Sequence, residues 1–137
     1  MKINIAEKIA PCFDDVFFDI HEHNHTHYWL KGGRGSTKSS FISTQIPLLL
    51  INNPMCHAVV LRKVGNTLRN SVYNQIQWGI SHVGLTSKFK FITSPLEITY
   101  KKTGQKILFF GVDDKTKIKS IKLPFGYVGI VWYEELD

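Results

Sequence analysis

The sequence predicts an α/β fold in which helices flank a parallel sheet. Two short apolar segments typical of strands, Tyr28–Lys31 and Ala58–Leu61, are each followed by a segment whose apolar residues have helical spacing. A third apolar run, Tyr127–Tyr133, is nearly continuous, as expected for a parallel strand that is covered on both faces. Strands that alternate with helices favour a parallel sheet with right-handed crossovers.

Residues 1–27 form a lead-in segment before the first strand. We expect a helix around Ile5–Phe18, interrupted by Pro11. The segment lacks a continuous apolar core and carries acidic residues, so it is not a signal peptide. Four alternating histidines could present imidazoles for a metal on one face of a strand, but no cysteine or aspartate completes such a site. We interpret them as a polar lead-in: His21, His23, His25 and His27.

A glycine-rich loop, Gly32-Gly33-Arg34-Gly35-Ser36-Thr37-Lys38-Ser39, connects the first strand to its helix. In this layout glycines let backbone N–H groups turn toward a polyphosphate, a lysine reaches the terminal oxygens, and the next hydroxyl binds Mg²⁺. The usual pattern, G-x-x-x-x-G-K-[ST], has a glycine where this chain has Thr37. The remaining features still predict a phosphate-binding loop for ATP and Mg²⁺, with Lys38 and Ser39 in those two roles.

The final apolar run ends in two acidic residues, Glu134 and Glu135. A loop that binds ATP requires one carboxylate to hold the Mg²⁺ shell and another to activate water, at the end of a neighbouring strand. We assign the first role to Glu134, often through water, and the second to Glu135. One buried strand intervenes between the loop strand and the acid strand, which fits the additional-strand, RecA-like class of P-loop NTPases.

The two helices that follow the first two strands have different signals. The first meets Pro47, which should kink or end it. The second can be capped by Asn66 or Thr67. Its apolar stripe has a spacing of four, four, four and three residues: Leu68, Val72, Ile76, Ile80 and Val83.

Three short segments after the second helix read as a β-ribbon and a further strand. They are Phe89–Ile92, Glu97–Tyr100 and Ile107–Phe110, with a glycine-containing turn between the last two. A basic segment, 113–121, then precedes the acid strand.

Length and composition exclude several classes of protein. The 137 residues, of which 43% are hydrophobic, suit one domain with a real core. No apolar run approaches the 18 or so residues that would span a membrane. Cys12 and Cys56 are isolated and read as small buried hydrophobic residues rather than as metal ligands or a disulfide framework.

The net charge is +6, and the excess is uneven. Seven lysines lie between residues 101 and 122. Such a patch suits nucleic acid or the phosphates of a neighbouring subunit's ATP, and a merely solvated face is the alternative. No arginine follows Arg69, so a cation acting in trans from this region would be a lysine, such as Lys117, Lys119 or Lys122.

Several blocks in the same order resemble the large subunit of a tailed-phage terminase of the PBSX type. They are the loop GGRGSTKS, VVLRKVGNTLRNSVYNQI, SPLEITYKKTGQKILFFGVDDKTKIKSI and the closing WYEELD. The resemblance covers residues 28–137, about four-fifths of the chain. It implies an ATPase motor that moves double-stranded viral DNA into the procapsid, in the host cytoplasm and transiently at the portal.

The same resemblance implies partners and further roles. The partners are the portal protein, the small terminase subunit and further copies of the chain in a ring. Arg34 becomes a candidate for contacting the γ-phosphate or a catalytic acid. The backbone N–H groups that face the phosphates would be those of Gly33, Gly35, Ser36 and Thr37.

The family's nuclease half and its coupling motif would both follow the acid strand. We therefore expect residues 28–137 to be a truncated P-loop ATPase domain, incomplete at its C-terminus. Two alternatives stay open: a nucleotide-binding remnant without turnover, and a RecA-like helicase fragment.

Overall fold

The structure is a computed structural model, and it describes residues 38–63, 65 and 68–134. The lead-in 1–27, the expected strand Tyr28–Lys31, loop residues 32–37 and Glu135 lie outside the described residues. Among the described helices, none combines the length and the apolar character needed to cross a membrane. The elements in chain order are α3 (Lys38–Asn52), β1 (Cys56–Arg62), the π-helix η3 (Arg69–Tyr73), α4 (Asn74–His82), the 3₁₀ turn η4 (Thr86–Lys88), β2 (Phe89–Thr93), β3 (Leu96–Tyr100), β4 (Lys106–Gly111), α5 (Lys115–Lys119) and β5 (Tyr127–Glu134).

The five strands form one sheet in the order β2-β3-β4-β1-β5. β1 is parallel to both β4 and β5, whereas β3 is antiparallel to β2 and to β4. Short turns connect β2 to β3 and β3 to β4, and a short turn returns the chain in the opposite direction. The predicted β-ribbon, formed by β2 and β3, is thus confirmed, and it extends the sheet by pairing antiparallel with β4. The sheet is therefore mixed, and it is parallel only across β4, β1 and β5.

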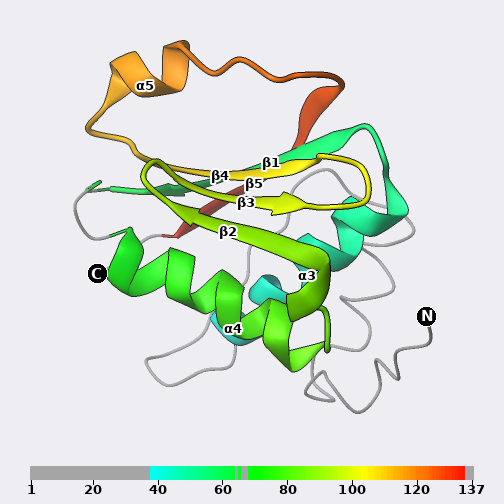
Figure 1. The fold of residues 1–137 in the computed structure, drawn as a ribbon. Helices are drawn as coiled ribbons and strands as arrows, with labels where there is room; N and C mark the ends of the chain where they lie inside the picture. Colours follow the sequence, from blue (N-terminus) through cyan, green and yellow to red (C-terminus); the bar gives the residue numbers. More distant parts are fainter. Residues whose placement is uncertain (1–37, 64, 66–67, 135–137) are drawn as a thin grey trace.

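Helices α3 and α4 cover one side of the sheet, and the short α5 lies on the other side (Figure 1). Side chains alternate between the two faces of a strand, and Val60, Phe109 and Trp132 pack in one core with residues of both helices. The predicted helical stripe from Leu68 to Val83 is buried at every position. The second helix is therefore confirmed, although its first turn is the π-helix η3.

Helix α3 does not end at Pro47, contrary to one of the two outcomes expected for it. The helix continues to Asn52 with Pro47 inside. Proline lacks the N–H that would bond to the carbonyl four residues earlier, which is that of Ser43. Gly79 of α4 packs against this same carbonyl, because a Cβ built on Gly79 would lie 2.2 Å from the Ser43 oxygen. The two helices thus approach each other where the proline alters the bonding of α3.

Strand β5 is covered on one face only, so the expectation that both faces are buried is wrong for the described residues. Trp132 is buried in the core beneath the sheet. On the opposite face Val131 and Tyr133 are 61% and 47% exposed. The reason is that α3 and α4 pack on the Trp132 face, so among the described elements the Val131 face of this edge strand is left to solvent.

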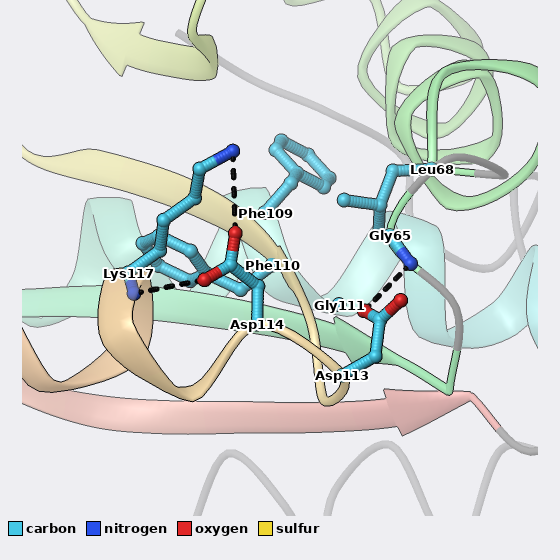
Figure 2. A pocket seen from close by; sticks show the side chains of 8 residues that line it. All are labelled: Gly65, Leu68, Phe109, Phe110, Gly111, Asp113, Asp114 and Lys117. Carbon is cyan, nitrogen blue, oxygen red and sulfur yellow. Dashed lines mark hydrogen bonds and ion pairs between the residues drawn. The ribbon is translucent and has the colours of Figure 1, made fainter.

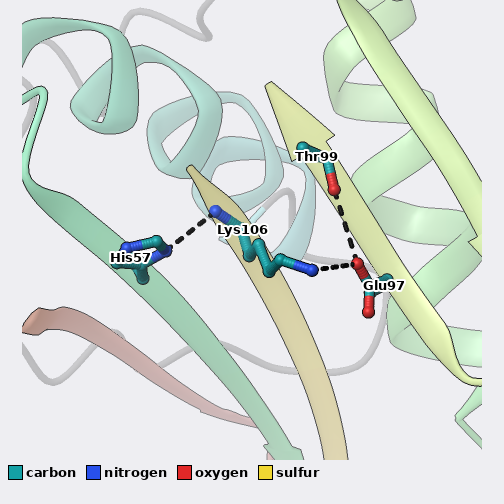
Figure 3. A network of polar contacts seen from close by, with 4 residues as sticks. All are labelled: His57, Glu97, Thr99 and Lys106. Carbon is teal, nitrogen blue, oxygen red and sulfur yellow. Dashed lines mark hydrogen bonds and ion pairs between the residues drawn. The ribbon is translucent and has the colours of Figure 1, made fainter. Parts of the chain in front are cut away.

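The buried His57 and the partly buried Lys106 and Glu97 connect the strands at the end where β1 and β4 begin (Figure 3). The Nδ1 of His57 accepts a hydrogen bond from the Lys106 backbone N–H at 3.0 Å. The Nε2 therefore carries the proton and donates to the Phe125 carbonyl at 2.7 Å. The Lys106 ammonium in turn contacts Glu97 on β3 at 2.7 Å. These contacts link β1, β4 and β3 and lie away from the end at which β5 finishes.

Candidate functional site

Three parallel strands finish side by side at one edge of the sheet. Arg62, the last residue of β1, is level with Gly111, the last residue of β4, and with Glu134, the last residue of β5. In open α/β sheets, ligands bind in the crevice outside the carboxyl ends of the strands. We call this end of the sheet the carboxyl edge, and it is the candidate site.

Arg62 and Glu134 form an ion pair at the carboxyl edge. The Arg62 Nε lies 3.3 Å from the Glu134 Oε2, and the two side chains are 9% and 20% exposed. Two residues earlier on each strand, Val60 and Trp132 belong to the core under α3 and α4. Because side chains alternate, Arg62 and Glu134 also face this helical layer.

An irregularity in β5 produces this alignment. His57 is level with Val128, but Ala58 is level with Ile130, so Gly129 is an extra residue in β5. Without it, Arg62 would be level with Tyr133. A Cβ at Gly129 would lie 2.6 Å from the Cys56 Sγ, so the bulge depends on a residue without a side chain.

Helix α3 begins near the same edge. Its 15 residues span about 22 Å. The 7 residues of β1, which follow after a short turn and run back along the sheet, span about 23 Å. The first turn of α3, with Lys38 and the partly exposed Ser39, therefore returns to the level at which β1 and β5 end. The N-terminus of a helix has free N–H groups and a partial positive charge, which suit a phosphate.

The loops after β1 and β4 meet at the carboxyl edge (Figure 2). The Gly65 N–H donates to the Asp113 Oδ1 at 3.0 Å. Gly111 leaves space for this contact, because a Cβ there would lie 2.3 Å from the Gly65 nitrogen and from the same carboxylate oxygen. A cavity of about 380 Å³ opens beside it, lined by Gly65, Leu68, Phe109, Phe110, Gly111, Asp113, Asp114 and Lys117.

The basic segment forms the short helix α5 on the exposed side of the sheet. Asp114 caps this helix by accepting the Lys117 N–H at 3.2 Å, and its other oxygen lies 3.5 Å from the Lys117 ammonium. Lys115, Lys117 and Lys119 are exposed. The lysines are therefore available to solvent or to a polyanion, as expected from the sequence.

Two buried groups in the core of the fold, Tyr73 and Cys56, have altered acidities, and Cys56 lies at the opposite end of β1 from the carboxyl edge. Burial raises the pKa of the Tyr73 phenol, and the nearby Arg69 partly opposes this rise. The Tyr73 hydroxyl donates to the Ile92 carbonyl at 3.1 Å, and its ring packs edge-on against Phe109. Burial also raises the pKa of the Cys56 thiol. Both shifts favour the neutral, packed form of the side chain.

The structure describes some of the predicted site residues and not others. The loop residues Gly32, Gly33, Arg34, Gly35, Ser36 and Thr37, and the acid Glu135, lie outside the described residues. Of the others, Lys38 and Ser39 begin α3 and Glu134 ends β5, so all three belong to elements that lead to the carboxyl edge. Sequence reasoning missed Arg62 and the Gly65–Asp113 contact, because neither belongs to a motif and both depend on strand register. Within the described residues no group of three or more His, Cys, Asp or Glu could hold a metal ion.

Comparison with known proteins identifies the family. Residues 24–137 match the family described as phage terminase large subunit. The chain belongs to this family, and the resemblance inferred from the sequence is confirmed. It is 40% identical over 135 residues to the terminase large subunit of Bacillus phage SPP1, covering 98% of this chain and 32% of that protein. It is 33% identical over 131 residues to the PBSX phage terminase large subunit of Bacillus subtilis strain 168, covering 96% of this chain and 28% of that protein.

The matches also show how much of each relative the chain covers. It spans about a third of the length of the relatives that it matches.

Proposed function

We propose that this chain is the ATPase motor portion of a phage terminase large subunit, which uses ATP hydrolysis to move viral DNA into the procapsid. The observation that carries the proposal is the arrangement at the carboxyl edge. The first turn of α3 and the carboxylate of Glu134 come from distant parts of the sequence and lead to the same end of the sheet. Together with the family, this supports a P-loop NTPase of the additional-strand class over residues 28–137.

Each proposed role follows from the chemistry of the residue. Backbone N–H groups of the loop 32–37 would bind the phosphates, and Arg34 would contact the γ-phosphate or a catalytic acid. Lys38 would bridge the β- and γ-phosphate oxygens as a point charge. Glu135 would orient and deprotonate the attacking water.

The residues fit a magnesium ion. Mg²⁺ prefers oxygen ligands and keeps several waters, and it is commonly held by one or two carboxylates together with substrate phosphates. Ser39 offers a hydroxyl in the first turn of α3, and Glu134 offers a carboxylate that is 20% exposed. When bound, the ion would neutralise charge on the phosphate oxygens.

The partners proposed for the whole protein are those implied by the family. They are double-stranded viral DNA, the portal protein, the small terminase subunit and further copies of the chain in a ring, in the host cytoplasm and at the procapsid portal. The exposed lysines of α5 are candidates for contacts with DNA phosphates or with a neighbouring subunit's ATP. Family membership argues against the helicase alternative. A nucleotide-binding remnant without turnover stays as the second candidate, and a measurement of hydrolysis distinguishes the two.

Nucleotide binding is the part of the proposal that this chain can test directly. Titration of a fluorescent ATP analogue with Mg²⁺ should show binding by the wild type and a large loss of affinity in Lys38→Ala. Lys90→Ala, which removes an exposed lysine near the start of β2 and so at the opposite end of the sheet, serves as the control and should bind like the wild type. Equal affinity in wild type and Lys38→Ala, with both folded, would contradict the assigned site.

Turnover separates the motor from the remnant. In a full-length protein with this sequence, Glu135→Gln should retain nucleotide binding and lose about 10²–10⁴-fold in hydrolysis rate. Single-turnover hydrolysis near the wild-type rate would reassign the base. No hydrolysis by the full-length wild type in the presence of DNA would favour the remnant.

A further inference from the structure

Arg62 is a buried charged residue to which neither the sequence motifs nor the proposed function assigns a role. Its side chain is 9% exposed, and it ends β1 opposite the last residue of β5. Arginine is almost never fully buried unless it is paired. The pair with Glu134 accounts for the burial, but it does not explain why an ion pair occupies this position.

Stability is a weak explanation for the pair. Removing two charges from water costs several kcal/mol per ion, and apolar replacements of a buried pair are often neutral or stabilising. The surrounding core offers such a replacement, because Val60 and Trp132, two residues earlier, are simply packed. The special feature is the location: the pair stands at the carboxyl edge, and its acid is the residue proposed for the magnesium shell.

We propose that Arg62 is a positioning residue for Glu134. The inference rests on the proposed function, in which Glu134 contributes to the magnesium shell. A guanidinium whose Nε lies 3.3 Å from the Glu134 Oε2 attracts this carboxylate toward the end of β1 and supplies the counter-charge that a largely buried acid needs; the pair acts through charge, because the two atoms are not in hydrogen-bond geometry. Outer partners that orient a metal-binding carboxylate are worth about 10–100-fold in metal affinity. Arg62 thus acts on the metal through Glu134.

The alignment that the role requires is built into the backbone. The extra residue Gly129 places Glu134, rather than Tyr133, level with Arg62. Bulges commonly re-aim a side chain beside an active site. The bulge and the ion pair are separate features of the structure, and both direct the Glu134 carboxylate toward the layer in which α3 begins.

The test measures how much magnesium contributes to nucleotide binding. The affinity of the 137-residue chain for a fluorescent ATP analogue is determined with Mg²⁺ and with EDTA, and the ratio of the two affinities is compared among variants. Arg62→Met removes the charge and keeps the length of the side chain. It should lower this ratio by about 10–100-fold, as should Glu134→Gln. Arg62→Lys keeps a positive charge without the planar fork and should lie between Arg62→Met and the wild type.

The matched control is Lys106→Met. It removes the cation of another ion pair in the same sheet, Lys106 with Glu97 at 2.7 Å, which lies away from the carboxyl edge. This variant should leave the ratio unchanged. Circular dichroism establishes that each variant is folded at the temperature of the titration, and Arg62→Gln takes the place of Arg62→Met if the latter does not fold.

The outcomes separate the inference from the proposed function. If Glu134→Gln lowers the ratio and Arg62→Met does not, or if Lys106→Met lowers it equally, the positioning role is overturned and the proposed function stands. If magnesium does not strengthen binding by the wild type, or Lys38→Ala binds like the wild type, the proposed function fails and the inference fails with it. A selective loss in the Arg62 variants supports both.

Discussion

Replacing Gln105 by Met should destabilise the fold by removing a specific set of buried hydrogen bonds. Gln105 lies in the turn between β3 and β4 and is completely buried. Its Nε2 lies 2.9 Å from the Leu50 carbonyl, 2.8 Å from that of Asn53 and 2.7 Å from that of Cys56. One amide group therefore holds together the end of α3, the following turn and the start of β1.

The size of the destabilisation depends on which hydrogen bonds each acceptor carbonyl still makes after Gln105 is replaced. A primary amide has two N–H groups, so two of the three contacts can be good hydrogen bonds at one time. The Leu50 carbonyl also accepts the Asn53 N–H, and the Asn53 carbonyl also accepts the Cys56 N–H. These acceptors are not left bare, so the loss is about 0.5–1.5 kcal/mol per bond rather than the full cost of an unsatisfied group. The Gln105 Oε1 also accepts the Thr103 hydroxyl at 2.8 Å, so Gln105→Met, which conserves length, loses about three hydrogen bonds and should lower the free energy of unfolding by about 1.5–4.5 kcal/mol.

Urea unfolding followed by circular dichroism measures this quantity. The matched control is Gln77→Met on α4, where the side chain is only partly buried. A surface change of this kind usually stays within about 0.5 kcal/mol. If Gln105→Met is as stable as Gln77→Met, the three hydrogen bonds do not contribute as the structure indicates, and the reasoning about this turn is refuted.

Three further predictions concern packing, pH and charge. Gly79→Ala should destabilise by about 1–3 kcal/mol in urea unfolding, despite the better helix propensity of alanine, because its Cβ would lie 2.2 Å from the Ser43 carbonyl oxygen; a rise in stability would contradict the close approach of the two helices. Burial raises the pKa of Tyr73, so the stability that this group contributes is complete below about pH 10 and is lost as pH rises beyond it; the fall should be smaller in Tyr73→Phe when unfolding is measured up to pH 11. Replacing Lys119 and Lys122 by Gln should reduce the salt slope of DNA binding by about one unit for each DNA phosphate that the variant no longer neutralises, and an unchanged slope would favour a trans-acting or a merely solvated role for these lysines.

The elements with a strong local signal were predictable. The apolar run Ala58–Leu61 predicted β1, and the spacing of the stripe from Leu68 to Val83 predicted a helix whose apolar side is fully buried. These patterns work because burial on one face, or on both, repeats with the period of the element. The ribbon is equally readable, because its strands are short and separated by turns.

The wrong predictions concern features that depend on neighbours far away in the sequence. Of the two outcomes predicted for Pro47, a kink or an end of α3, the end is wrong, because the helix continues through it and α4 packs at the affected carbonyl through Gly79. The run Tyr127–Tyr133 is apolar throughout, which predicts burial on both faces. Burial on both faces also requires other elements to pack on each face, and the composition of the strand does not contain this information. In the structure Val131 and Tyr133 are exposed.

Register is the property of the candidate site that the sequence could not supply. Arg62 and Glu134 are 72 residues apart, and neither belongs to a pattern that links them. Counting along regular parallel strands from His57 and Val128 would place Arg62 beside the exposed Tyr133. The single extra residue Gly129 changes this count, and with it the face on which every later residue of β5 lies. A one-residue irregularity thus decides whether the acid at the end of the strand faces α3 and a buried arginine or faces the opposite, exposed side.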